Sequence, residues 1–435
     1  MLIPTHCQQI VLAVVAALFS TVAAQAAPPG PEPTTIHAGR VLDVRAGTYA
    51  EDVLIHIEDG KILSISKVVN GEIPASAVDL SDLTVLPGLI DAHTHLCDNS
   101  YLGESWDPWI LPAPMFGVIG AQNAGKVLRA GFTTVRNVSD PYYCGVALRE
   151  AVTQGWAEGP RIFASGPMIT ITGGHGAWGN WMAPQHELRD RGAVADGPVE
   201  VRRQVRTHIR HGVDLIKLSA TGGFGTHGTI PGAASYTEEE IRAAVEEGTR
   251  RGLHVAAHAH GADGIGNAVR AGVRSIEHGG LMDSESIRLI KEHDVYLVTD
   301  LLAAYYDLVE TDQDWSDKEL ESDNAEEYRK YAALVEEAHR AGVKIAFGTD
   351  SGVYPHGRNA EQFQLLVDAG MSPLEAIRSA TTVAAELLGL EDEAGAVEAG
   401  LWADLIAVVG DPLAGVSVLT EVRFVMKGGT VVLRK

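Results

Sequence analysis

Apolar runs with the period of a strand alternate with amphipathic segments of helical period through the middle of the chain. The helical pattern is clearest at residues 237–251 and 324–341, where apolar side chains recur every three to four positions. Eight apolar strands are expected, and they end near His95, Asp140, Met168, Ala220, His260, Gly279, Leu302 and Asp350. Eight strand-then-helix units predict an α/β fold, a closed (β/α)8 TIM barrel over residues 86–395.

Short strand-like runs occur again at the two ends of the chain. Near the beginning, two alternating runs flank Asp59-Gly60, and an Asp-Gly pair in that position is typical of a β-hairpin. Similar runs return only between residues 404 and 433. The simplest arrangement pairs the two ends, so we expect a small β-sandwich domain built from residues 34–85 and 396–435.

The beginning of the chain has the composition of an export signal. The first 26 residues contain no Asp, Glu, Lys or Arg, residues 10–24 are almost wholly apolar, and Ala24-Gln25-Ala26 offers a small-x-small cleavage site. We therefore expect a signal peptide at 1–26, a Pro-rich linker at 27–33, and a periplasmic or secreted protein without stable membrane association. An uncleaved membrane anchor is the alternative, since no basic residue precedes the apolar run.

Removal of the signal would take Cys7 away and leave Cys97 and Cys144. Two cysteines are too few for a disulfide framework. A single bridge between them is one alternative, but we expect two buried free thiols.

The charge balance narrows the class of partner. With 57 acidic and 34 basic residues the formal net charge is −23, which repels nucleic acid and anionic membrane surfaces. A small-molecule or dipeptide substrate is the better expectation.

Polar residues that bind metals recur at the expected strand ends. His93 and His95 lie two residues apart, and residues i and i+2 of a strand point to the same side. Lys217 stands inside an apolar strand, where a charged ammonium is unfavourable. Each residue alone has an ordinary explanation, such as a core histidine, a snorkelling lysine or a helix N-cap. One metal centre explains the whole set: His93, His95, Lys217, His258, His278 and Asp350.

The sequence resembles the amidohydrolase superfamily, in particular its secreted prolidase-like, carboxypeptidase-like and ochratoxin-hydrolysing members. The resemblance rests on motifs in a specific order: PGLIDAHTHL, GFTTVRNVSD, GVDLIKLSATGG, VAAHAHG, SIEHG, FGTDS and ADLIAVVGDPL. These motifs are specific for the superfamily and less specific for the substrate. Trp402, where relatives often carry a lysine, is a departure in the β-domain and does not touch the chemistry.

The resemblance implies two divalent metal ions. His93, His95 and Asp350 would bind the first, and His258 and His278 the second. Lys217, carboxylated by carbon dioxide to a carbamate, would bridge them. Imidazole with carboxylate-type oxygens suits zinc. The implied mechanism is attack by a hydroxide shared between the metals, with Asp350 as the base that carries the proton to the leaving nitrogen.

The resemblance also implies groups that face the substrate. His175, in the loop sequence TGGHG, and His260, two residues after a metal ligand, are candidate catalytic and substrate-binding residues. Tyr236, Arg136 and Arg358 are candidates for binding a carboxylate, although Arg136 has an alternative role in tying barrel strands together. The expected substrate is an amide next to a free carboxylate, as in N-acyl amino acids, Xaa-Pro dipeptides or ochratoxin A.

Other functions compete on the same barrel. A hydrolase of cyclic amides or lactones would use the same site. A single-metal deaminase is disfavoured because such relatives generally lack the lysine at position 217, and a non-catalytic homologue is disfavoured because all six ligand positions are filled. Relatives assemble as dimers up to octamers, so we expect a homo-oligomer without selecting its size.

Overall fold

The computed structural model of the protein describes residues 32–105, 111–177, 180, 193–310 and 321–435. The expected signal at 1–26 and most of the linker lie outside the described residues. Within the described part of the chain, no helix combines the length and the apolar character that crossing a membrane requires.

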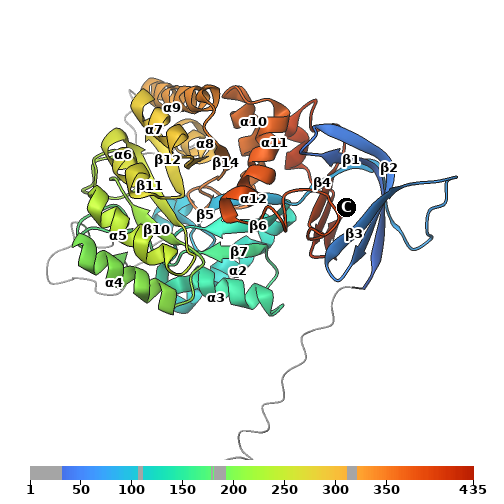
Figure 1. Ribbon diagram of the computed structural model, residues 1–435, viewed down its shortest axis with the longest axis horizontal. Helices are drawn as coiled ribbons and strands as arrows, with labels where there is room; N and C mark the ends of the chain where they lie inside the picture. The colour runs from blue at the N-terminus through green and yellow to red at the C-terminus, as the bar shows by residue number, and fades with distance from the viewer. Residues whose placement is uncertain (1–31, 106–110, 178–179, 181–192, 311–320) are drawn as a thin grey trace, which may run out of the picture.

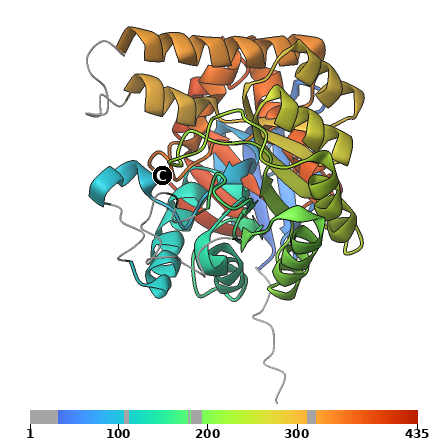
Figure 2. The same ribbon diagram turned by 90° about the vertical axis from the view of Figure 1, so that its left-hand side faces the viewer.

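The barrel predicted from the sequence is present, and each of its eight parallel strands ends close to an expected position. They are β5 (Leu89–Thr94), β6 (Phe132–Asn137), β7 (Arg161–Ala164), β10 (Ile216–Ser219), β11 (Val255–Gly261), β12 (Ser275–Leu281), β13 (Tyr296–Thr299) and β14 (Ile345–Phe347). Every residue of β5, β6 and β11 is buried, because helices cover the outer face and side chains fill the interior. Figure 2 shows the strands surrounded by these helices.

Hydrogen bonds group the barrel strands into two arcs. One arc is β5-β6-β7, and the other is β14-β13-β12-β11-β10-β8-β9, extended by the short strands β8 (Ile169–Thr170) and β9 (Ala193–Val194). Backbone bonds connect the arcs: Asp350 N donates to His93 O (2.8 Å), and Asp214 N donates to Ala164 O (2.8 Å). The first of these bonds brings two expected metal ligands together where the barrel closes.

Eleven α-helices are assigned within the described residues, and most pack around the strands (Figure 1). α5 begins with a capping box between Thr237 and Glu240, as its sequence pattern favours. The helices are α2 (Ala113–Arg129), α3 (Cys144–Thr153), α4 (Gly197–Arg210), α5 (Glu238–Thr249), α6 (Ala262–Ala271), α7 (Ser284–Glu292), α8 (Leu301–Tyr305), α9 (Glu321–Ala341), α10 (Gln362–Asp368), α11 (Pro373–Ser379) and α12 (Thr382–Leu388).

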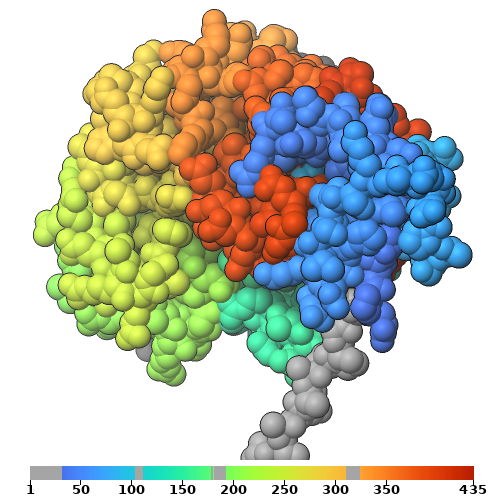
Figure 3. All heavy atoms as spheres, turned by 45° about the vertical axis from the view of Figure 1, so that its right-hand side comes forward, coloured from blue at the N-terminus to red at the C-terminus, as the bar shows by residue number. Residues whose placement is uncertain are grey.

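The two ends of the chain pair with each other, as expected, but the expected β-sandwich is one continuous sheet rather than two separate ones. Hydrogen bonds run through all seven of its strands as a single mixed sheet in the order β17-β16-β15-β4-β1-β2-β3. Figure 3 shows the C-terminal segment in red against the N-terminal strands in blue. The strands are β1 (Thr34–Asp43), β2 (Thr48–Glu58), β3 (Lys61–Lys67), β4 (Val78–Pro87), β15 (Leu405–Val408), β16 (Phe424–Lys427) and β17 (Thr430–Arg434).

Two short connections position the strands of the β-domain and the first barrel strand. Asp59 (φ 49°) and Gly60 (φ 76°) form the tight hairpin between β2 and β3, since this turn requires positive φ at both central residues. β4 runs to Pro87, and β5 begins two residues later at Leu89. The β-domain therefore leads directly into the strand that carries the first histidine of the candidate site.

One expectation about the cysteines is wrong. Cys97 and Cys144 are not free thiols but form a disulfide that connects residues 47 positions apart. The pairing depends on the loop after β5 lying against the start of α3, which the local sequence does not show.

Candidate metal centre

The six expected ligands come together at the carboxyl ends of the barrel strands. Lys217 lies on β10, His258 on β11, and His278 on β12. His93 is on β5, His95 directly follows it, and Asp350 follows β14. Oδ1 of Asp350 is 3.2 Å from Nε2 of His93 and 2.8 Å from Nε2 of His95.

Two groups of side chains have the spacing of metal ligands. The possible ligand atoms of His93, His278 and Asp350 lie within 4.8 Å of one another, and so do those of His258, His260 and His278. His278 belongs to both groups, so the two sets are adjacent. The second group also includes His260, which the sequence assigned to the substrate rather than to a metal.

Acceptors behind the ligands set which ring nitrogen of each histidine carries the proton. Three Nδ1–H groups donate outward: His93 to Glu277 Oε2 (2.8 Å), His95 to the carbonyl oxygen of Ser139 (3.0 Å) and His278 to Asp300 Oδ2 (2.8 Å). With the proton on Nδ1, a neutral ring at any of these positions would have the lone pair of Nε2 available for a cation.

The ionisation of the two carboxylate acceptors supports this assignment. Burial opposes the charged form of Glu277, but Arg136 and the other cations nearby hold its pKa well below its ordinary value. Burial likewise opposes charge on Asp300, but His278 keeps the pKa of Asp300 lowered. Both carboxylates can therefore only accept.

Lys217 is a buried amine among charged side chains. Its side chain is 1% exposed, and the carboxylates of Glu277, Asp350 and Asp300 act on it electrostatically. Burial lowers the pKa of Lys217 to about 8, so the neutral amine is far more populated near neutral pH than in an exposed lysine. Nε2 of His93 is also buried and without a hydrogen bond. These atoms fit a centre that needs cations and a bridging anion to be complete.

The backbone is strained at two of the ligands. His278 has φ 73° and Asp350 has φ 56°, a region that residues other than glycine rarely adopt. Such conformations persist where the surrounding fold imposes them, and they concentrate at functional sites. Here they turn the two side chains toward the same group of atoms.

Arg136 does not face the mouth of the site. Its guanidinium lies in the barrel interior, where Nη2 donates to both carboxylate oxygens of Glu277 (2.8 Å each), Nη1 to Ser275 Oγ (3.0 Å) and Nε to the carbonyl of Ala92. A guanidinium with these partners ties β5, β6 and β12 together. This placement favours the strand-tying alternative over contact with a substrate carboxylate.

Two other candidates are engaged elsewhere. The hydroxyl of Tyr236 is buried and donates to the carbonyl of Ala195 (2.7 Å). Arg358 donates to both oxygens of Glu361 (2.8 and 2.7 Å). Both groups therefore already have protein acceptors.

His175 and His260 lie directly beside the ligands. The ring of His175 is 4.3 Å from that of His258, and the ring of His260 is 4.7 Å from it. Burial lowers the pKa of His175 to about 4 and that of His260 to about 3, so both rings are neutral at pH 7. Nδ1 of His175 is 2.8 Å from Thr226 Oγ1, and the exposed ring of Phe224 stands edge-on to His260 at 4.9 Å.

The sequence reasoning missed several residues of the centre. Glu277 and Asp300 are the acceptors behind His93 and His278, and Thr226 and Phe224 come from the loop after β10. Asp300 carried the same signal as the residues that were found, a polar side chain directly after an apolar strand. Glu277 stood inside a recognised motif, but nothing local showed which ring it would contact.

Residues 84–432 match the model of the amidohydrolase family. The chain belongs to the amidohydrolase family. Ochratoxinase from Aspergillus niger is 32% identical over 369 residues, which cover 79% of this chain and 75% of that protein. The resemblance seen in the sequence motifs is thereby confirmed.

Solved structures of amidohydrolases agree with this assignment. A Xaa-Pro dipeptidase with bound methionine superposes with a TM-score of 0.85 at 37% identity, over 92% of this chain and 99% of that one. A prolidase complexed with N-methylphosphonate-L-proline superposes with a TM-score of 0.82 at 31% identity, over 93% of this chain and 100% of that one. The predicted fold class is confirmed, and the protein is a hydrolase that acts on C–N bonds.

Proposed function

We propose that this amidohydrolase cleaves a linear amide bond next to a free carboxylate, using two divalent metal ions. The observation that carries the two-metal part is Lys217, a buried amine that lies with five further candidate ligands at the carboxyl ends of the barrel strands. The substrate class is supported by the relatives, which are named for Xaa-Pro dipeptides, for proline compounds and for ochratoxin.

In this proposal His93, His95 and Asp350 would hold one cation and His258 and His278 the other, and Lys217, as a carbamate, would supply anionic oxygen ligands. Imidazole and carboxylate donors favour zinc. When bound, the two cations would polarise the scissile carbonyl and lower the pKa of water.

Asp350 is the proposed proton carrier. Burial opposes its charged form, but His93 and His95 hold the pKa of Asp350 well below its usual range. An ionised carboxylate at this position can accept a proton from the attacking water and deliver it to the leaving nitrogen. Its side chain is 14% exposed, so it can contact both the ligands and a substrate.

His175 and His260 are the proposed substrate contacts. Because Arg136, Tyr236 and Arg358 are engaged with protein acceptors, recognition of the carboxylate falls to His175. Thr226 Oγ1 accepts the amide hydrogen of Gly176 (3.2 Å) and lies 2.8 Å from Nδ1 of His175. With the Thr226 hydroxyl donating to Nδ1, Nε2 of His175 carries the proton and can donate to the substrate.

A hydrolysis screen with zinc-reconstituted protein tests the proposal. N-acyl-L-amino acids and Xaa-Pro dipeptides are expected to be cleaved. Their carboxamide or methyl ester counterparts should lose at least about tenfold in kcat/KM, roughly 1.4 kcal/mol for one lost charged hydrogen bond. Equal rates for acid and amide, or turnover only of hydantoins, lactams or lactones, would refute this substrate class.

We also propose that the protein works outside the cytoplasm as a homo-oligomer. Support for export comes from the apolar first residues and from the Cys97–Cys144 disulfide, since disulfides persist in oxidising compartments. Cell fractionation with N-terminal sequencing tests the location, and light scattering tests the assembly.

A further inference from the structure

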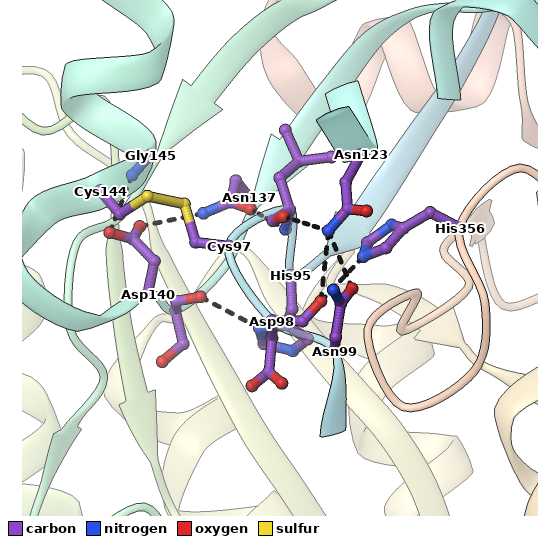
Figure 4. Close-up of a disulfide and its surroundings, with 12 residues drawn as sticks. His95, Cys97, Asp98, Asn99, Asn123, Asn137, Asp140, Cys144, Gly145 and His356 are labelled. Carbon is purple, nitrogen blue, oxygen red and sulfur yellow. Dashed lines mark hydrogen bonds between the residues drawn. A yellow bond between two sulfur atoms is a disulfide. The ribbon is translucent and has the colours of Figure 1, made fainter. Parts of the chain in front are cut away.

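The disulfide joins the two segments that hold His95. Cys97 follows His95 by two residues, and Cys144 is the first residue of α3, five residues after Ser139. The carbonyl of Ser139 is the acceptor for Nδ1–H of His95. Figure 4 shows the sulfur bridge beside His95, Asn137 and Asp140. The crosslink therefore connects the ligand's own loop to the loop that carries its acceptor.

The Cys97 side of the bridge is anchored to the barrel independently. Asn123 on α2 donates to the carbonyl of Leu96 (2.9 Å), and His356 donates to the carbonyl of Asp98 (3.0 Å). These two bonds flank Cys97 on both sides. A covalent bond from this fixed point can hold the opposite segment in place.

The segment between Ser139 and Cys144 has a strained backbone, so it needs a contact that keeps it in place. Tyr142 and Tyr143 both have φ 56°, and two successive left-handed residues other than glycine are unfavourable unless the surroundings impose them. They stand directly before Cys144, where α3 begins. The bridge fixes the end of this strained turn.

A short chain of hydrogen bonds runs beside the bridge. Leu96 N donates to Asn137 Oδ1 (2.7 Å), Asn137 Nδ2 donates to Asp140 Oδ2 (2.9 Å), and Gly145 N donates to Asp140 Oδ1 (2.9 Å). The polar chain and the disulfide thus connect the same two segments. Asn137 offers a way to weaken this connection without changing a cysteine.

We propose that the Cys97–Cys144 disulfide is a positioning crosslink for the metal ligand His95. It keeps the Ser139 carbonyl against Nδ1–H, which holds the ring in the tautomer and orientation that present Nε2 to the first cation. The metal part of this inference rests on the proposed two-metal function. Cys97 and Cys144 are 1% and 6% exposed, so a reductant reaches the sulfurs only after local opening, and the crosslink acts as a permanent part of the site rather than a switch.

The test compares Cys97→Ala/Cys144→Ala with the wild type, both loaded with zinc and then exposed to excess EDTA. Release of one of the two zinc ions is expected to be at least tenfold faster in the double variant. Asn137→Ala, with the disulfide intact, should show a smaller acceleration. The matched control is Ile55→Ala, a buried substitution in the β-domain. Zinc release from each protein is measured at the same number of degrees below that protein's own melting temperature.

Unchanged zinc release in the double variant would overturn the inference. Equal acceleration in Ile55→Ala would also overturn it, because the effect would then be general destabilisation. If the double variant does not fold, the wild type is incubated with a phosphine until local opening has exposed the bridge to it; the phosphine takes oxygen from water and leaves two thiols. Zinc release from the reduced wild type is then compared with zinc release from the oxidised wild type, and equal rates would overturn the inference.

A second readout does not depend on metal. In the metal-free protein, NMR of nitrogen-15-labelled histidine should show the Nδ1–H of His95 protected from exchange with water by its bond to the Ser139 carbonyl, and the double variant should show faster exchange at Nδ1. Comparison with His95→Gln identifies the signal. A wild type that takes up no zinc would refute the proposed function, and the NMR result would still decide the crosslink: unchanged exchange of the His95 Nδ1–H in the double variant would overturn it.

Discussion

Replacing Glu277 by Gln tests whether the interior of the barrel depends on a buried charge pair. Glu277 is completely buried on β12, and both of its oxygens lie 2.8 Å from Nη2 of Arg136. One oxygen also accepts Nδ1–H of His93 at 2.8 Å. The amide of Gln has about the same shape, so the change removes the charge and one acceptor with little effect on packing.

The expected loss follows from what remains in the barrel. Glu277→Gln leaves the Arg136 guanidinium buried without its counter-ion, and breaking a buried pair from one side typically costs about 3–5 kcal/mol. Urea unfolding of the metal-free protein, followed by circular dichroism, measures this change. The control is Glu285→Gln in the exposed pair with Arg288, where the shift should be much smaller because water screens the charges.

The pH dependence has a definite sign. Burial raises and Arg136 lowers the pKa of Glu277, and the net result lies below the ordinary value. A carboxyl with a lowered folded-state pKa contributes stability that is present above its unfolded pKa, about 4.3, and lost as the pH falls through the folded value. The difference in the free energy of unfolding between wild type and Glu277→Gln should therefore be constant from pH 7 to pH 5 and shrink below about pH 4. If Glu277→Gln lowers the free energy of unfolding by less than about 1 kcal/mol at pH 7, the buried pair contributes no more than an exposed one, and the reasoning is refuted.

Three further predictions concern the metal centre. Lys217→Ala should lose the bridged metal pair and nearly all activity, with partial recovery in short carboxylic acids; two retained zinc ions and near-native turnover without additives would contradict the carbamate. Asp350→Asn should keep the fold and lower kcat by roughly 10²–10⁴-fold, because an amide cannot carry the proton, whereas a few-fold loss in steady-state assays would move the base role to His260 or His175. His175→Asn should raise KM for acid substrates and narrow the acid-to-carboxamide preference, and an unchanged ratio of kcat/KM values would remove His175 from carboxylate recognition.

The sequence alone was sufficient for the barrel and for the expectation that the candidate ligands lie at its mouth. Side chains in a strand alternate with a period of two, so the spacing of His93 and His95 by itself assigns both rings to one side. Lys217 stood out because a lysine inside an apolar strand conflicts with burial. Parallel strands in a closed barrel direct their carboxyl ends to one mouth, so residues distant in the sequence could be expected to lie together.

Tertiary structure decided which partner each of these side chains has. Arg136 pairs with Glu277, 141 positions away, and a local pattern cannot show which strands contribute to one layer of the barrel interior. The bond between Cys97 and Cys144 depended in the same way on a loop meeting a helix start.

The hydrogen-bond acceptors of the histidine Nδ1–H groups could not be predicted from the sequence either. Ser139 contacts Nδ1 of His95 through its backbone carbonyl, and a backbone group has no signature in residue type at all. Periodicity reports which face a side chain occupies, because the backbone repeat fixes that direction locally. Hydrogen-bond partners depend on distances between separate segments, and those distances exist only once the barrel has closed.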